Sequence, residues 1–330
     1  IIIKLFKLII SGGENMYLSQ RYSLEDFNEV LDKNNPEVFK IKNKTGEGSF
    51  KSYNVFPGVF VVYNDFDMYE CSSTFKGDSN MFCIDYCKEG RMEWVCHNND
   101  YLYLKQGDMQ MTVRKHHGKD FGFPLKKYKG ITIVFYLDEA NKSIKKSLDN
   151  FDVDLYDLRN KLCARDEPFI MRTKSGIEHV FNELYEVNHH IRDSYLKIKE
   201  VELLLFFKTL DGDKDREERT YFKKSQVEKI KQISKYMIDN IDKHITLEAL
   251  SNKFGCSLTS MKRCFKEVYG DTIYNYMKSY RMNEACILLK ESNDNISNIA
   301  SYLGYDNPSK FAAAFKSVTG ITPLKYRKSG

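Results

Sequence analysis

The sequence lacks several patterns that mark common classes of protein. None of its eight cysteines stands in a CxxC pair and no regular spacing joins them, which favours reduced thiols over a disulfide framework in a chain of 330 residues. It contains no nucleophile motif and no phosphate-binding glycine loop. Its most apolar stretch, residues 1–10, is too short to span a bilayer and is interrupted by Lys4 and Lys7. We therefore expect a cytoplasmic protein without a membrane segment.

The cysteines and histidines of the sequence are also poorly spaced for a metal site. Cys83, Cys87, Cys96 and His97 come nearest to a ligand cluster, but alternating strands explain their spacing at least as well. His116-His117 are adjacent in a basic loop, and a strand would point them to opposite faces. We expect no metal, no cofactor and no catalytic residue.

The composition is that of an ordinary globular protein, with 42% hydrophobic and 29% charged residues, and the chain is long enough for two domains. Its net charge of +5 is unevenly distributed. Residues 223–330 hold 18 Lys or Arg and 10 Asp or Glu, a net charge of +8, which leaves −3 for the preceding residues. A basic C-terminal third is what a phosphate-binding module requires.

The first fifteen residues form a separate case. Gly-Gly-Glu-Asn before Met16 is what a ribosome-binding sequence would encode if it were read in frame. We expect translation to begin at Met16 and residues 1–15 to be an untranslated or non-structural leader. A short signal-like segment and a genuine extra strand are the alternatives.

Residues 16–210 predict an antiparallel β domain with packing helices. A short capped helix is predicted over residues 23–31. Beyond it, short β-branched and aromatic stretches with turn residues between them predict a small β-barrel or jelly roll. The predicted strands are residues 59–63, 81–87, 91–96, 101–104, 109–113 and 131–137, with turns at 88–90, 97–100 and 106–108.

Helical periodicity returns after residue 138. Short helices are predicted at residues 140–151 and 155–163, and two longer ones within residues 175–210, separated at His189-His190. Residues 211–219 are highly charged and have no apolar period, so we interpret residues 211–224 as a linker.

Residues 245–330 contain one helical unit twice. Each unit opens with a capped helix, at Thr246 and at Asn295, and an amphipathic helix of about 27 Å over residues 273–290 separates the two. Two helix-turn-helix units are therefore expected. At an offset of 50 residues the matching pairs are Met261 and Phe311, Phe265 and Phe315, Lys266 and Lys316, Gly270 and Gly320, Thr272 and Thr322, and Tyr276 and Tyr326.

The second unit closely resembles the signature of the AraC/XylS family of bacterial transcription regulators. Tyr305 replaces the usual phenylalanine of that signature. The matching residues are Ile299-Ala300, Gly304-Tyr305, Ser309, Phe311, Phe315-Lys316, Gly320, Thr322-Pro323 and Tyr326-Arg327.

The resemblance implies an α+β protein of two domains. The C-terminal domain, residues 225–330, would be an all-α double helix-turn-helix that binds promoter DNA. The N-terminal domain, residues 16–210, would be a cupin-like sensor that holds a small-molecule effector and dimerises through its helices. The family also implies an activator that contacts RNA polymerase.

The first recognition helix carries most of the expected DNA contacts. Ser257 is its predicted N-cap, and a buried stripe leaves one polar face outward. That face holds Thr259, Ser260, Lys262, Arg263 and Lys266. Thr259, Lys262 and Arg263 are the candidates for reading bases, because Arg and Lys reach guanine and Thr meets the thymine methyl. Lys266 is assigned to the phosphate backbone.

The second recognition helix is poorer in polar groups. Ala312 and Ala313 stand where the first has Lys262 and Arg263, so Asn307, Ser309 and Lys310 remain as the contacts. We predict that the first unit reads sequence and the second mainly positions the protein. Arg281, on the intervening helix, matches a family position and is given a phosphate or inter-unit role.

Effector residues are less well specified. Tyr63, Tyr86, Trp94 and Phe135 could line an apolar pocket, and ordinary core packing explains each of them as well. Two alternatives stay open at this stage: an enzyme built on the N-terminal barrel, and a constitutive DNA-binding protein whose barrel serves only dimerisation.

Overall fold

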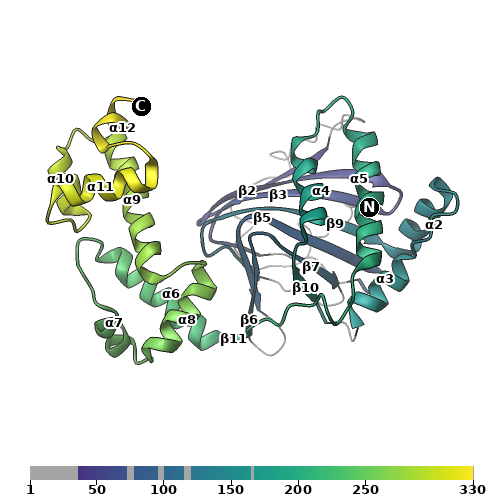
Figure 1. Cartoon of the computed structure of the whole chain (residues 1–330), viewed down its shortest axis with the longest axis horizontal. Helices are drawn as coiled ribbons and strands as arrows, with labels where there is room; N and C mark the ends of the chain where they lie inside the picture. The colour runs from purple at the N-terminus through teal and green to yellow at the C-terminus, as the bar shows by residue number, and fades with distance from the viewer. Residues whose placement is uncertain (1–35, 73–77, 96–99, 115–119, 165–166, 330) are drawn as a thin grey trace. The chain divides into compact units, whose positions relative to one another are not determined.

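The structure, a computed structural model, describes residues 36–72, 78–95, 100–114, 120–164 and 167–329. The chain divides into two compact units, Ile1–Tyr221 (unit 1) and Phe222–Gly330 (unit 2) (Figure 1). The leader and the helix predicted at residues 23–31 lie outside the described residues.

Unit 1 is built on antiparallel strands. Its strands are β1 (Glu37–Asn43), β2 (Gly46–Phe56), β3 (Val59–Asp67), β4 (Glu70–Ser72), β5 (Met81–Val95), β6 (Asp100–Lys105), β7 (Asp108–Val113), β8 (Asp120–Gly122), β9 (Lys127–Tyr136) and β10 (Phe169–Arg172). They follow the order β1-β2-β3-β9-β5-β6, while β7 and β8 also pair with β5, β10 with β7, and β4 with β8. Among the described strands the order does not return to β1, so the antiparallel sheet is confirmed and closure into a barrel is not.

Strand β5 shows that the turn predicted at residues 88–90 was wrong. Two strands were expected at residues 81–87 and 91–96, with a turn at 88–90, but a single strand runs from Met81 to Val95. Its register against β9 shifts between Cys87 and Glu89, and Gly90 has a φ of 82°. A Cβ at Gly90 would collide with the Lys127 carbonyl group. The Gly-containing segment therefore bends one long strand at a bulge, and does not reverse the chain.

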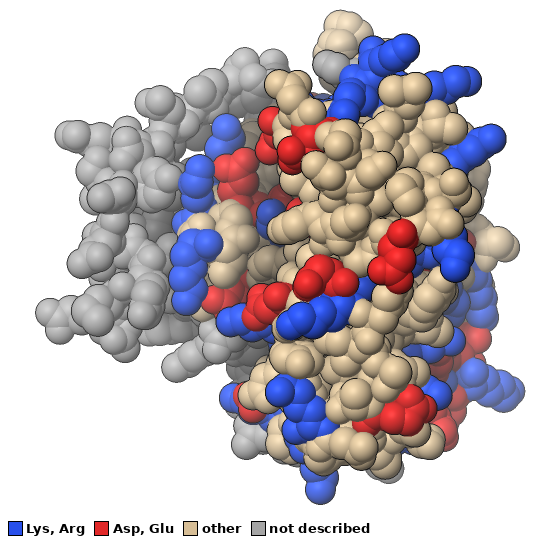
Figure 2. Space-filling model, turned by 90° about the vertical axis from the view of Figure 1, so that its left-hand side faces the viewer, with Lys and Arg blue, Asp and Glu red and all other residues tan. Residues whose placement is uncertain are grey.

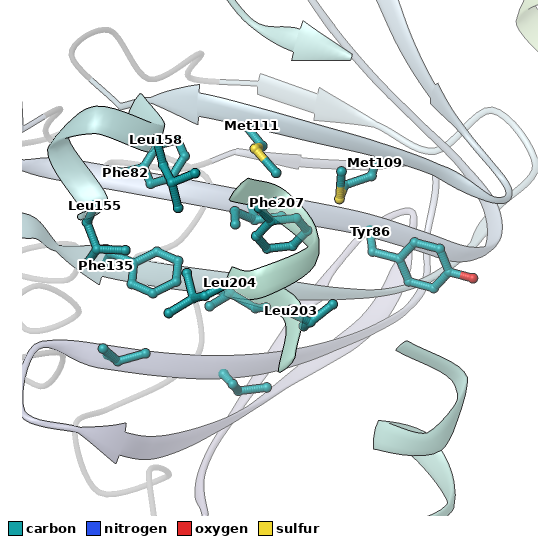
Figure 3. Close-up of a cluster of buried hydrophobic side chains, with 14 of the residues drawn as sticks. Phe82, Tyr86, Met109, Met111, Phe135, Leu155, Leu158, Leu203, Leu204 and Phe207 are labelled. Atoms are coloured by element: carbon teal, nitrogen blue, oxygen red, sulfur yellow. The ribbon is translucent and has the colours of Figure 1, made fainter. Parts of the chain in front are cut away.

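The helices of unit 1 cover one face of the sheet. They are α2 (Leu137–Ser147), α3 (Leu155–Leu162), α4 (Ser175–Glu186) and α5 (Arg192–Thr209). The predicted break at His189-His190 is confirmed, since those residues lie between α4 and α5. Leu155 and Leu158 of α3 and Leu203, Leu204 and Phe207 of α5 are buried in one core with side chains from β5, β7 and β9 (Figures 1 and 3).

The charged segment after α5 is folded against unit 1. The guanidinium group of Arg216 donates to the carbonyl oxygens of Leu162 at 2.9 Å and Pro168 at 2.6 Å. The Glu217 N–H donates to the Ile170 carbonyl at 2.8 Å. Composition predicted a linker over residues 211–224, and these contacts tie the first half of that segment to α3 and the β10 region.

Unit 2 is helical. It contains a two-residue strand, β11 (Phe222–Lys223), and the helices α6 (Lys224–Asp239), α7 (Leu247–Phe254), α8 (Leu258–Tyr269), α9 (Ile273–Glu291), α10 (Ile296–Tyr302), α11 (Pro308–Thr319) and α12 (Pro323–Lys328). None of the described helices in either unit combines the length and apolar character needed to cross a membrane.

The internal repeat is confirmed by matching contacts. Phe265 of α8 meets Tyr276 of α9 edge to face, with ring centroids 5.3 Å apart and an interplanar angle of 76°. Phe315 of α11 meets Tyr326 of α12 in the same way, at 5.5 Å and 78°. Each recognition helix is thus fastened to the helix that follows it by the same aromatic pair.

Candidate DNA interface

Helix α8 begins at a side-chain N-cap and presents one polar face outward. The Ser257 hydroxyl accepts a hydrogen bond from the Ser260 N–H at 3.2 Å, which satisfies one of the free amides at the helix start. The predicted buried stripe is confirmed, with Met261, Cys264, Phe265 and Val268 at 1% exposure or less. On the outward face, Thr259, Lys262, Arg263 and Lys266 are exposed and Ser260 is half-buried.

Contacts from α6 and β11 hold the turn between α7 and α8 and one side chain of α8. Gly255 ends α7 with a φ of 57°, and its carbonyl oxygen accepts from the Lys229 ammonium of α6 at 3.2 Å. The Arg263 guanidinium lies 5.7 Å from the centroid of the Phe222 ring. This cation–π contact orients an exposed arginine without neutralising its charge.

Helix α11 presents a different surface. The Asn307 side chain accepts from the Ser309 N–H at 2.8 Å, so Asn307 caps the helix. Asn307, Ser309 and Lys310 are all exposed. Farther along, Ala313 is exposed and Ala312 half-buried, so methyl groups stand where α8 carries two cations.

Arg281 of α9 lies against the loop between α6 and α7. Its Nε and Nη2 atoms donate to the Ile241 carbonyl oxygen at 3.1 and 3.0 Å, and Nη2 also donates to the Lys243 carbonyl at 3.1 Å. Gly304, in the turn between α10 and α11, approaches the same loop: a Cβ there would lie 2.8 Å from the Asp242 carbonyl oxygen. The α6–α7 loop therefore contacts both the connecting helix and the second helix-turn-helix turn.

The surface of unit 2 carries side chains of both charges. On the face drawn in Figure 2, Lys and Arg side chains alternate with Asp and Glu side chains. The net charge of +8 over residues 223–330 favours phosphate binding by this part of the chain as a whole.

The four suggested effector residues do not share one site. Tyr63 lines a pocket of about 280 Å³ in unit 1, and Tyr86 lines a second of about 260 Å³. Tyr86 stands at the edge of the apolar core with its hydroxyl directed away, whereas Phe135 lies inside that core (Figure 3). Trp94 packs against a separate cluster. Phe135 and Trp94 are therefore better explained by packing.

The Tyr63 pocket contains residues that sequence reasoning missed. Tyr53, Tyr185 and Arg192 line it together with Tyr63, and the Tyr63 hydroxyl donates to the Leu184 carbonyl oxygen at 2.7 Å. The two residues of that bond are 121 positions apart. No local periodicity could have paired them, because folding of α4 against the sheet brings them together.

A metal site finds no support in the described part of the chain, where no group of three or more His, Cys, Asp or Glu side chains could hold an ion. Cys96, His97 and His116-His117 lie outside that part. Cys83 and Cys87 are buried, free thiols whose pKa values are raised by burial to about 11 and about 12. Buried neutral thiols of this kind are inert packing residues.

Comparison with known proteins locates similarity in unit 2 above all. Residues 250–329 match a family model described as a helix-turn-helix domain. The chain is 32% identical over 98 residues to the multiple antibiotic resistance protein MarA of Escherichia coli, which covers 30% of this chain and 77% of MarA.

Two further proteins are similar to this chain. The HTH-type transcriptional activator RhaS of Mannheimia succiniciproducens is 29% identical over 191 residues, which covers 58% of this chain and 68% of RhaS. The solved C-terminal domain of AraT, a response regulator from Geobacillus stearothermophilus, is 26% identical, with a TM-score of 0.30 over 31% of this chain and 85% of that domain.

Proposed function

The chain belongs to the AraC family of DNA-binding transcription regulators, and on that basis we propose that it is an effector-responsive activator that reads its promoter mainly through α8. Helix α11 would position the second helix-turn-helix on the phosphate backbone. The observation that carries this division of labour is the pair of exposed cations on α8, Lys262 and Arg263, whose repeat equivalents on α11 are alanines.

The length of helix α9 supports simultaneous DNA binding by the two helix-turn-helix units. Its 19 residues correspond to about 28 Å at 1.5 Å per residue. Recognition helices separated on this scale fit successive major-groove faces, which recur about every 34 Å. One protomer would therefore contact two adjacent turns of the duplex, with base readout concentrated at one of them.

Unit 1 is proposed as the sensor and dimerisation domain, related to the cupin-like domains of the family. Residues 16–210 would sense and dimerise, residues 211–224 would connect, and residues 225–330 would bind DNA. Ile191, Ile198 and Leu205 support dimerisation, because they are 55%, 62% and 50% exposed and recur every seven residues at the start of and along α5. A stripe with this repeat suits the same helix of a second copy.

The protein would act in the cytoplasm, recruit RNA polymerase once bound upstream of a gene, and carry out no catalysis of its own. The relatives support this proposal, since RhaS is a transcriptional activator by name.

Selection of binding sites from randomised duplex DNA with the full chain tests the proposal. Against the selected site, we expect Arg263→Ala to cost about 1–3 kcal/mol and to relax one base pair. Lys310→Ala should weaken all duplexes about equally and reduce the salt slope by about 1. Lys235→Ala, an exposed cation of α6, is the matched control and should change neither quantity.

Equal losses of specificity in the two variants, or a larger loss for Lys310→Ala, would contradict the division of labour. Failure to enrich any sequence would contradict specific binding itself. Chromatin immunoprecipitation of the tagged protein in its host, with and without Arg263→Ala, would then identify the promoters.

A further inference from the structure

The pocket of unit 1 that includes Tyr63 has an aromatic wall. Tyr53 and Tyr63 meet edge to face with ring centroids 5.6 Å apart, and Tyr63 and Tyr185 do so at 5.5 Å. Strands β2, β3 and β9 supply one side of this pocket, and the end of α4 and start of α5 supply the other. Its volume of about 280 Å³ falls just below the range of drug-sized ligand sites, so it suits a small, single-ring molecule.

Cations outnumber carboxylates around this wall. Lys51, Lys129 and Arg192 line the pocket, and among the described residues that line it Asp65 is the one acidic residue. The Lys129 ammonium lies 3.6 Å from the Asp65 carboxylate, a long contact between partly exposed groups. Two positive charges therefore remain in excess, and their field favours an anion.

Arg192 is built into the pocket. Its Nη1 atom donates to the Tyr53 hydroxyl at 3.2 Å, and Nη2 donates to the Val187 carbonyl oxygen at 3.3 Å. The guanidinium also lies 5.5 Å from the Tyr53 ring centroid. These contacts orient the group at the first turn of α5, and a planar guanidinium suits the two oxygens of a carboxylate.

Tyr185 contributes an unsatisfied polar atom. Its hydroxyl oxygen is buried and has no hydrogen-bond partner among the residues that the structure describes. Burial raises the pKa of Tyr185 far above its ordinary value, so the hydroxyl stays protonated and able to donate. An unpaired buried donor is costly, and the neutral Tyr185 ring adds an uncharged aromatic surface to the wall of the pocket.

A cationic ligand fits this pocket less well. Aromatic walls can bind ammonium groups, but the rings here already face protein cations. Lys88 lies 4.0 Å from the Tyr185 centroid, and Arg192 covers Tyr53. A further positive charge would be repelled by both.

We propose that this pocket binds a small aromatic carboxylate, whose ring packs among the three tyrosines and whose oxygens meet Arg192 and Lys51. The assignment rests on the proposed function, since it names the chemical class of the effector. An anion held there would join the end of α4 to the start of α5, the helix that carries the exposed apolar stripe.

Titration of the full chain without DNA, by calorimetry, tests the site. The probes are benzoate, phenylacetate and 4-hydroxybenzoate, with benzamide as a neutral control of the same shape and benzyltrimethylammonium as a cationic one. We expect at least one carboxylate to bind about tenfold or more tightly than both controls, because each charge-assisted hydrogen bond is worth about that factor.

Variants then locate the binding. Arg192→Gln should weaken the bound carboxylate about tenfold or more, and Lys51→Gln should weaken it several-fold while leaving the Tyr53 contact intact. Because Arg192→Gln can disturb the start of α5, the affinity of Lys51→Gln, a change at an exposed residue, gives an independent measurement of the site. Lys146→Gln, an exposed lysine of α2 outside the pocket, should bind as the unchanged protein does.

The proposal is overturned if no carboxylate of the set binds, if benzamide or the ammonium binds as tightly, or if Lys51→Gln and Arg192→Gln leave the affinity unchanged. DNA binding is measured separately on the same preparations. If the unchanged protein binds DNA but none of the carboxylates, the pocket proposal alone is refuted. If it binds a carboxylate but recognises no promoter sequence, the regulator proposal alone is refuted.

Discussion

Arg219 and Asp108 form a buried ion pair, with 2.9 Å between Nη1 and Oδ2 and side-chain exposures of 6% and 2%. Arg219 ends the charged segment that follows α5, and Asp108 opens β7. The Asp108 carboxylate also accepts from the Lys105 N–H at 2.9 Å and lies 3.6 Å from Arg172. This single carboxylate therefore joins the hairpin before β7, the end of β10 and the segment that leads to unit 2.

Asp108→Asn should release that segment. Breaking the buried ion pair leaves Arg219 with Glu217 as its remaining carboxylate partner, at 2.7 Å, so we expect a loss of about 1–3 kcal/mol in the free energy of unfolding of unit 1. Limited trypsin digestion checks this, with faster cleavage after Arg216 and Arg219 expected in the variant. Asp152→Asn, which removes an exposed partner of Lys208, should leave the digestion pattern unchanged. Unchanged digestion of both variants would contradict the anchoring role.

Arg281→Lys distinguishes a structural role from a phosphate contact. Lysine keeps the charge but cannot reach the Ile241 and Lys243 carbonyl oxygens together, so we expect a stability loss of about 1–3 kcal/mol and an unchanged salt slope for DNA binding. Thermal unfolding and binding titrations at several salt concentrations measure the two. If Arg281 contacted phosphate instead, Arg281→Gln would reduce the salt slope by about 1 while Arg281→Lys preserved stability.

Gly304→Ala and Gly255→Ala form a matched pair. Both residues have positive φ, 76° and 57°, so alanine should cost about 1–2 kcal/mol at each from backbone strain. A Cβ at Gly304 would also lie 2.8 Å from the Asp242 carbonyl oxygen, whereas one at Gly255 would have no neighbour within 4 Å. Urea unfolding should therefore show the larger loss for Gly304→Ala. Equal losses would mean that the α6–α7 loop can move aside.

Glu200 should make stability depend on pH. It is buried in α5, its Oε1 has no hydrogen-bond partner in the described part of the chain, and desolvation raises its pKa from 4.5 to about 8. The folded state thus binds the proton more tightly than the unfolded state. The stability that protonated Glu200 contributes is fully present below about pH 4.5. It declines as the pH rises toward 8, by about 5 kcal/mol at most.

Glu200→Gln should remove this decline, because glutamine does not ionise. Unfolding measured at several values between pH 5 and 8 should give a flatter profile for the variant, while Glu186→Gln, an exposed residue of α4, should follow the unchanged protein. Parallel profiles for all three proteins would contradict the burial of a protonated carboxyl group.

The DNA-binding unit could be derived from the sequence because its signals are local. N-caps at Thr246, Ser257 and Asn295 and apolar residues four apart describe single helices, and each cap is present in the structure. The repeat then required only that two similar sequences fold alike. The predicted roles of Arg263 and Lys310 in binding remain predictions.

The fold of unit 1 was harder to predict from the sequence, because its organisation depends on contacts between residues far apart in the chain. The sequence by itself determined the antiparallel character of its strands and the break between α4 and α5. Only the tertiary structure decided that residues 81–95 form one bent strand, that Phe135 is core, that Tyr63 and Arg192 share a pocket, and that Arg219 meets Asp108. Periodicity records which face of an element is buried, whereas partners more than a hundred residues apart are chosen by packing.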